Sequence, residues 1–136
     1  MRSHNNLDVW KKAVDFVVDV YKATESFPKE EKFGLTSQIR RASVSIAANI
    51  AEGAGRKSDK EFIQFLSHAQ GSASEVETEL LIASRLGFIQ TESYEVLSHT
   101  LDDIGRMITI DKSPETQSCH MTIHDSQFPI HAFDDC

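Results

Sequence analysis

Cysteine is scarce in this sequence, and long apolar runs are absent. The two cysteines, Cys119 and Cys136, lie outside every segment with helical periodicity, so no disulfide framework is predicted. No apolar run approaches the roughly 20 residues that span a bilayer, and the first six residues, MRSHNN, lack the apolar core of a secretory signal. With 40% apolar and 26% charged residues over 136 positions, the composition predicts one soluble globular domain in the cytoplasm.

Positive charge is also in short supply. The chain has 14 Lys and Arg against 21 Asp and Glu, a net charge of −7, whereas proteins that bind nucleic acid by bulk electrostatics are usually basic. The deficit is uneven, because residues 28–60 carry seven basic and four acidic side chains, and residues 61–110 carry two and eight. This asymmetry either sets a basic region against an acidic one, within or between protomers, or reflects ordinary solvated faces.

Only three prolines interrupt the chain, and apolar residues recur at helical spacing. Four helices are predicted: from about Leu7 to Thr24 with Asn5 or Asn6 as N-cap, from Phe33–Thr36 to about Glu52, from the Ser58 cap to Leu86, and from the Thr91 cap to about Ile110. Ser58 and Glu61 form a capping box, and Gly87 is a natural stop. Seams near a 3.5-residue period predict an all-α fold, an up-down antiparallel left-handed four-helix bundle over residues 1–110.

Each predicted helix has an inward seam. In the first helix the seam is Leu7, Trp10, Val14, Val17 and Tyr21, a stripe that Ala13, Phe16 and Val20 widen. In the second and third helices the seams are Leu35, Ile39, Ala42, Ile46 and Ile50; and Phe62, Leu66, Ala69, Ala73, Val76, Leu80 and Ala83. The second helix has another face of small residues, around Val44 and Ala48, so it is central or touches a neighbouring subunit. Gly53 fits the position after that helix, and Gly71-Ser72-Ala73 is interpreted as a close contact between helices.

Residues 111–136 are predicted to form an irregular or disordered tail. They have no sustained helical period, and they contain both cysteines and two of the prolines. Cys119, His120, His124 and His131 are zinc-type ligands, but their spacing matches no established site, so no metal is predicted. Docking of Phe128-Pro129-Ile130 and Phe133 on the bundle is the alternative to disorder.

The connection between the second and third helices carries the densest positive charge. Residues 53–58, GAGRKS, superficially resemble a phosphate loop, but Arg56 interrupts the Walker spacing and the context is helix to helix. Backbone N–H groups at the start of the third helix, flanked by Arg56, Lys57 and Lys60, could still bind a phosphate. We call these three residues the basic corner. Arg40 and Arg41 extend it only if they share its face, and an ordinary solvated corner is the alternative.

Polar residues inside the second helix have structural explanations. Asn49 lies beside apolar positions, and we expect it to form an interhelical hydrogen bond, because a buried amide needs a partner. Glu52 is expected to pair with Arg40, Arg41 or a neighbouring subunit.

No catalytic constellation can be assembled from the sequence. Glu75, Glu77 and Glu79 do not share one helical face, and the Glu-x-x-His pattern of di-iron bundles is absent. His68 and His99 are expected at the surface. The sequence therefore predicts no enzyme, no cofactor and no metal.

Several segments resemble the bacterial four-helix-bundle proteins encoded in 23S ribosomal RNA intervening sequences. They are QIRRASVSIAANIAEG at 38–53, LDVW at 7–10, FIQFL at 62–66 and AQGSASEVETEL at 69–80. The resemblance implies a small all-α bundle that forms ring-shaped homopentamers, with a further likeness to nucleic-acid-binding accessory proteins of diversity-generating retroelements. This chain departs from the family in its tail, and it is more acidic than the retroelement proteins.

Two functional interpretations follow. In the first, a non-enzymatic homo-oligomer, a pentamer by the resemblance, binds RNA or DNA phosphates through the basic corner, with Arg40 and Arg41 as further candidates. In the second, the oligomer is a protein–protein interaction scaffold without nucleic-acid binding.

Overall fold

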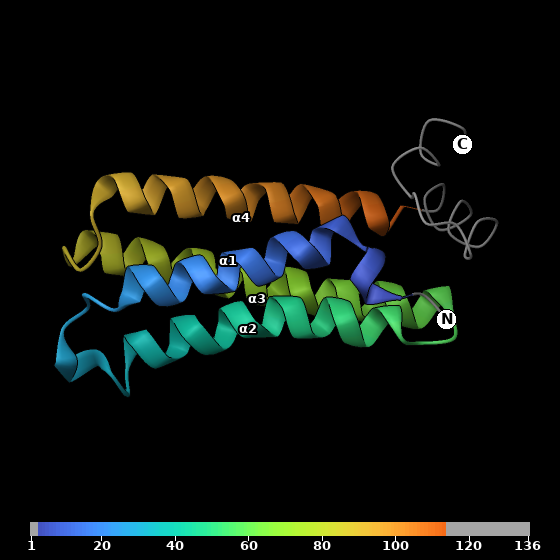
Figure 1. Ribbon diagram of the computed structural model, residues 1–136, viewed down its shortest axis with the longest axis horizontal. Helices are drawn as coiled ribbons and strands as arrows, with labels where there is room; N and C mark the ends of the chain where they lie inside the picture. Colours follow the sequence, from blue (N-terminus) through green and yellow to red (C-terminus); the bar gives the residue numbers. More distant parts are fainter. Residues whose placement is uncertain (1–2, 114–136) are drawn as a thin grey trace.

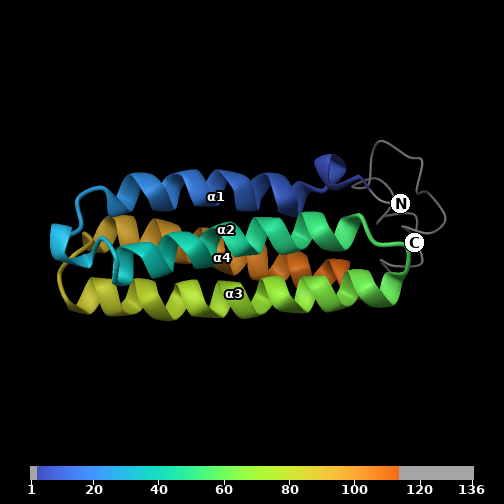
Figure 2. The same ribbon diagram turned by 90° about the horizontal axis from the view of Figure 1, so that it is seen from below.

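The computed structural model describes residues 3–113, which form an antiparallel bundle of four helices (Figures 1 and 2). The elements are the 3-10 turn η1 (His4–Asn6), α1 (Asp8–Thr24), the 3-10 turn η2 (Lys29–Glu31), α2 (Leu35–Ala54), α3 (Asp59–Arg85) and α4 (Thr91–Asp111). Figure 2 shows α1 and α3 on opposite sides, with α2 and α4 between them. The all-α prediction is confirmed. Most of the predicted tail, 111–136, lies outside the described residues.

Local sequence signals set both ends of α3. Ser58 caps α3, and its Oγ accepts the N–H of Glu61 at 3.1 Å, as the capping box predicts. Gly87 follows the end of α3 with φ 77°, a conformation that glycine adopts without strain. The predicted N-caps of two helices were wrong. Leu7 caps α1, because the η1 turn occupies the preceding asparagines, and Gln90 caps α4.

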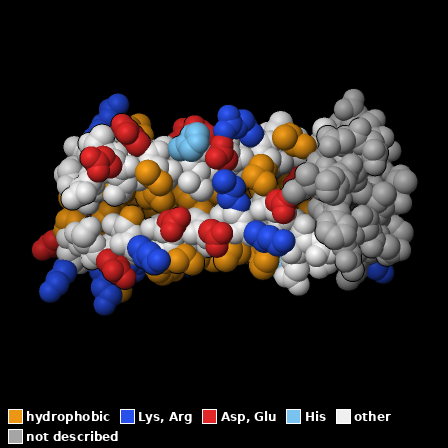
Figure 3. Space-filling view, turned by 45° about the horizontal axis from the view of Figure 1, so that its top comes forward, with side chains coloured by type: hydrophobic (Ala, Val, Ile, Leu, Met, Phe, Trp, Pro, Cys, Tyr) orange, Lys and Arg blue, Asp and Glu red, His pale blue; other side chains and the backbone are white. Residues whose placement is uncertain are grey.

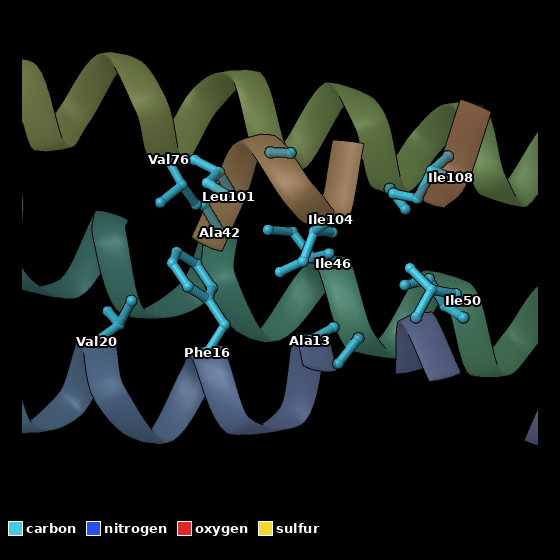
Figure 4. Close-up of a cluster of buried hydrophobic side chains, with 14 of the residues drawn as sticks. Ala13, Phe16, Val20, Ala42, Ile46, Ile50, Val76, Leu101, Ile104 and Ile108 are labelled. Carbon is cyan, nitrogen blue, oxygen red and sulfur yellow. The ribbon is translucent and has the colours of Figure 1, made fainter. Parts of the chain in front are cut away.

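The core lies along the bundle axis, but α1 is rotated from its predicted orientation. Figure 4 shows side chains from all four helices meeting there: Ala13, Phe16 and Val20 of α1, Ala42, Ile46 and Ile50 of α2, Val76 of α3, and Leu101, Ile104 and Ile108 of α4. The residues predicted to point inward from α1 lie mostly at the edge of the core, since Trp10 and Val14 are half-buried and Tyr21 is exposed. Two apolar stripes run along α1, and the one containing Phe16 faces the core.

The most extensive contact between two helices is between α2 and α3. The hydroxyls of Ser45 and Ser72 lie 2.8 Å apart across this contact. Gly53 is buried inside α2, not after its end, and a Cβ there would lie 2.6 Å from the Cβ of Phe65. The close contact predicted at Gly71-Ser72-Ala73 is found at Ser72, whereas Gly71 itself is exposed and a Cβ there would meet nothing within 4 Å.

Among residues 3–113, no helix has the length and apolar character that crossing a membrane requires.

Candidate nucleic-acid interface

The basic corner lies at the end of the bundle where α2 finishes and α3 begins (Figure 1). Arg56 is held from two directions. Its Nη2 donates to Oε1 of Glu52 at 2.5 Å, and its guanidinium carbon lies 4.8 Å from the centre of the Phe65 ring. Such stacking of a cation on an aromatic face is attractive. Glu52 therefore forms the expected ion pair, but with Arg56 and not with Arg40 or Arg41.

Lys57 and Lys60 differ from Arg56 in being free. Both are exposed, and neither has a hydrogen-bond or ion-pair partner within residues 3–113. The start of α3 is less available, because Ser58 Oγ already accepts one N–H and two acidic residues, Asp59 and Glu61, occupy the first turn. A phosphate at this corner would therefore contact the lysine side chains more than the helix terminus.

Arg40 and Arg41 do not lie beside the basic corner. Arg40 turns toward α1, where its Nε donates to Oγ1 of Thr24 at 2.8 Å and its Nη2 donates to the carbonyl oxygen of Tyr21 at 3.3 Å. Its guanidinium also lies 4.6 Å from the centre of the Tyr21 ring. Arg41 is exposed, but Ala54 at the end of α2 is thirteen positions further on, roughly 20 Å along the helix.

Known proteins share both the sequence pattern and the fold of this chain. The sequence profile of the 23S rRNA-intervening sequence protein family matches residues 5–110. The chain belongs to this family. A solved structure of a protein of unknown function from the S23 ribosomal protein family of Bacteroides thetaiotaomicron is similar, with a TM-score of 0.71 and 30% identity. The match covers 77% of this chain and 99% of that one. No curated protein matches.

The prediction that Asn49 forms an interhelical hydrogen bond was wrong, because its side chain bonds to Ser45 within α2. Asn49 Nδ2 donates to the carbonyl oxygen of Ser45 at 2.8 Å and to Ser45 Oγ at 3.0 Å. The hydrogen bond between Ser45 and Ser72 crosses to α3. Asn49 and Ser45 thus form a short chain of hydrogen bonds that ends at the neighbouring helix.

Residues 3–113 contain no group of three or more His, Cys, Asp or Glu side chains that could hold a metal ion. His68 and His99 are exposed, as expected. Two adjoining hollows of about 490 and 470 Å³ share Lys22, Ala23 and Ser93. The first lies between α1 and α4, and the second is also lined by residues 87–90, which connect α3 to α4. Figure 3 shows this side of the bundle, with hydrophobic side chains between two rows of charged ones.

Asp103 links α4 to α1 on the same side of the bundle. Its carboxylate accepts a hydrogen bond from Arg106 and lies 3.6 Å from Lys12 Nζ. The hydrogen bond from Arg106 is the main cause that lowers the pKa of Asp103, with smaller contributions from His99 and Lys12. These partners make Asp103 a surface connection between helices.

Glu79, a buried carboxylic acid, was not singled out from the sequence. Glu79 of α3 is only 5% exposed, and its Oε1 has no hydrogen-bond partner within residues 3–113. Burial, with a smaller contribution from the nearby carboxylate of Glu75, raises the pKa of Glu79 to about 7. A signal was available, because Glu79 follows Ser72 by seven residues and therefore lies on the same side of α3, toward α2.

Proposed function

We propose that this protein is a non-enzymatic, homo-oligomeric helical bundle of the cytoplasm that holds phosphates of RNA or DNA with its basic corner. The supporting observation is the exposure of Lys57 and Lys60, which have no partner within residues 3–113, beside an Arg56 that is already held in place. Long basic side chains that contact the phosphate backbone bind without reading bases and need no cofactor.

Self-association matters to this proposal because one corner offers few cations. Each phosphate contact gains a modest free energy through counterion release, which weakens as the salt concentration rises. Several corners on one assembly engage the same strand at a high effective concentration, so weak contacts combine into useful affinity. A pentamer, the state expected from the family resemblance, would present the corner once per copy.

The test is a double substitution, Lys57→Ala with Lys60→Ala, which leaves the structural Arg56 in place. Fluorescence anisotropy would follow binding of single-stranded RNA, hairpin RNA and duplex DNA at two salt concentrations. We expect wild-type binding to weaken with salt, and the variant to bind at least tenfold more weakly. Its salt slope should be shallower by about 1 for each phosphate that the lysines no longer bind. Light scattering would show an unchanged assembly.

The matched control is Lys29→Ala with Lys32→Ala, which removes two exposed lysines at the opposite end of the bundle (Figure 1). This control should bind like the wild type. Equal weakening in both variants would show that only total charge matters, and undiminished binding by the corner variant would refute the role of the corner.

A scaffold without nucleic-acid binding is the second candidate. Apolar side chains at the surface of three helices favour it, among them Val18, Val44 and Ile82. Exposed apolar patches on soluble proteins commonly mark interaction sites. An assembly that binds none of the three nucleic acids at low salt would support this candidate over the first.

A further inference from the structure

Phe65 contacts both a cation and a second ring beside the basic corner. Its ring centre lies 4.8 Å from the guanidinium carbon of Arg56 and 5.8 Å from the centre of the His68 ring, which meets it edge to face. Phe65 and His68 are three residues apart on α3, so they lie on the same side of that helix. We call Arg56, Phe65 and His68 the stacking cluster.

The backbone of α2 makes room for this cluster. Gly53 is buried, and a Cβ there would lie 2.6 Å from the Cβ of Phe65, so the missing side chain lets Phe65 lie against α2. The ring thereby reaches Arg56, which is also held by its hydrogen bond to Glu52 at 2.5 Å. The Arg56 side chain nevertheless stays 41% exposed, and His68 is exposed as well. Two flat groups with fixed neighbours are therefore accessible from outside.

Charge alone makes this end of the bundle a weak site for nucleic acid. Residues 52–61 carry three basic side chains and three acidic ones, Glu52, Asp59 and Glu61. These acids offset much of the attraction between the basic corner and phosphates. In a duplex the faces of the bases are already stacked on one another, whereas an unpaired base offers a free face to an aromatic ring or a guanidinium plane. Such stacking does not depend on net charge, so it favours single strands here.

We propose that the stacking cluster holds an unpaired base of single-stranded RNA or DNA. The base stacks on Arg56, on the side away from Phe65, and its flanking phosphates lie beside Lys57 and Lys60. Phe65 is a positioning residue for the guanidinium, and the exposed His68 offers a ring to the next base. The proposal rests on the nucleic-acid binding in the proposed function and names its ligand class. Stacking of this kind tolerates any base sequence.

The experiment compares strands that have the same phosphates with and without bases. Fluorescence anisotropy would follow binding of the full chain to a short oligothymidine, to an abasic deoxyribose-phosphate strand of equal length, to oligouridine and to duplex DNA. We expect oligothymidine to bind about tenfold more tightly than the abasic strand and the duplex. Oligouridine should also exceed the abasic strand, and its ratio to oligothymidine distinguishes RNA from DNA as the preferred source.

Arg56→Lys is the decisive variant, because it keeps the positive charge and removes the planar guanidinium. It should lose the preference for bases while its binding of the abasic strand changes little. Phe65→Leu, which keeps an apolar side chain against α2, and His68→Ala should each lose part of the preference. The matched control is Arg85→Lys, which makes the same exchange at an exposed arginine at the far end of α3 and should bind like the wild type. Circular dichroism would check that every variant is folded.

The corner lysines serve as the opposite test, since Lys57→Ala with Lys60→Ala should weaken the thymidine and abasic strands alike and keep the ratio between them. A wild type that binds none of the strands at low salt would overturn the proposed function and this proposal with it. Equal wild-type binding of the thymidine and abasic strands would overturn stacking, while phosphate binding by the corner would stand. A preference for bases that survives Arg56→Lys would also refute the proposal.

Discussion

Replacing Glu79 by glutamine should stabilise the protein at high pH and do little at low pH. The pKa of Glu79 is raised from its ordinary 4.5 to about 7, so between these values the folded chain holds a proton that the unfolded chain has released. The contribution of Glu79 to stability is therefore greatest below about pH 4.5, is lost as the pH rises from there to about 7, and changes little above that pH. At about 1.4 kcal/mol per pKa unit, ionising this buried acid costs about 3 kcal/mol by pH 8.

Glutamine removes the charge but adds an amide N–H₂ that needs partners, at a cost of about 1–2 kcal/mol. The net expectation is a gain of about 1–2 kcal/mol at pH 8 and none, or a small loss, at pH 5. Urea denaturation at fixed protein concentration, at both pH values, would measure the difference between variant and wild type. Glu77→Gln makes the same charge change on an exposed residue of α3 and is the matched control. A Glu79 variant whose effect is equal at the two pH values would refute the reasoning.

Two further predictions concern the helices themselves. Gly53→Ala should destabilise the fold by about 1–3 kcal/mol, because the new methyl group would collide with Phe65. Gly71→Ala should instead stabilise the fold by about 0.5–1 kcal/mol, because the methyl group there meets nothing within 4 Å. The same sign in urea titrations of both variants would contradict the assignment of Gly53 as the close-packed glycine. Ser58→Ala should lower the free energy of unfolding by about 1 kcal/mol, because it removes the cap on the Glu61 N–H. Aspartate also caps helices, so Ser58→Asp should be almost as stable as the wild type. An alanine variant as stable as the wild type would show that the cap contributes nothing.

Features set by neighbouring residues could be predicted from the sequence, and features set by contacts between helices could not. The Ser58 cap on the Glu61 N–H and the long apolar seam of α3 are local patterns, and both are present as expected. On α1, two apolar stripes have the same period, so spacing alone could not tell the stripe of Phe16 from that of Tyr21. The difference arises from packing, because the Phe16 stripe fits between α2 and α4.

The candidate site shows the same division. The basic corner itself is contiguous in sequence, so its position could be predicted. The partners of its residues come from elsewhere: Phe65 lies in the next helix, and Arg40 is drawn away from the corner by Thr24 and Tyr21 of α1. A charge count along the sequence groups Arg40 with the corner, whereas these contacts assign it to the joint between α1 and α2.

The double restraint on Arg56 has a consequence for the entropy of binding. An arginine that is free in solution loses rotamer freedom when a ligand fixes it, at about 0.5–1.5 kcal/mol for a long side chain. Arg56 already lies between Glu52 and Phe65, so that loss is incurred when the chain folds. A guanidinium has five N–H donors, and one bond to Glu52 leaves others for a ligand. Any anion that arrives at this corner therefore meets one preorganised donor group and needs to order only the two lysines.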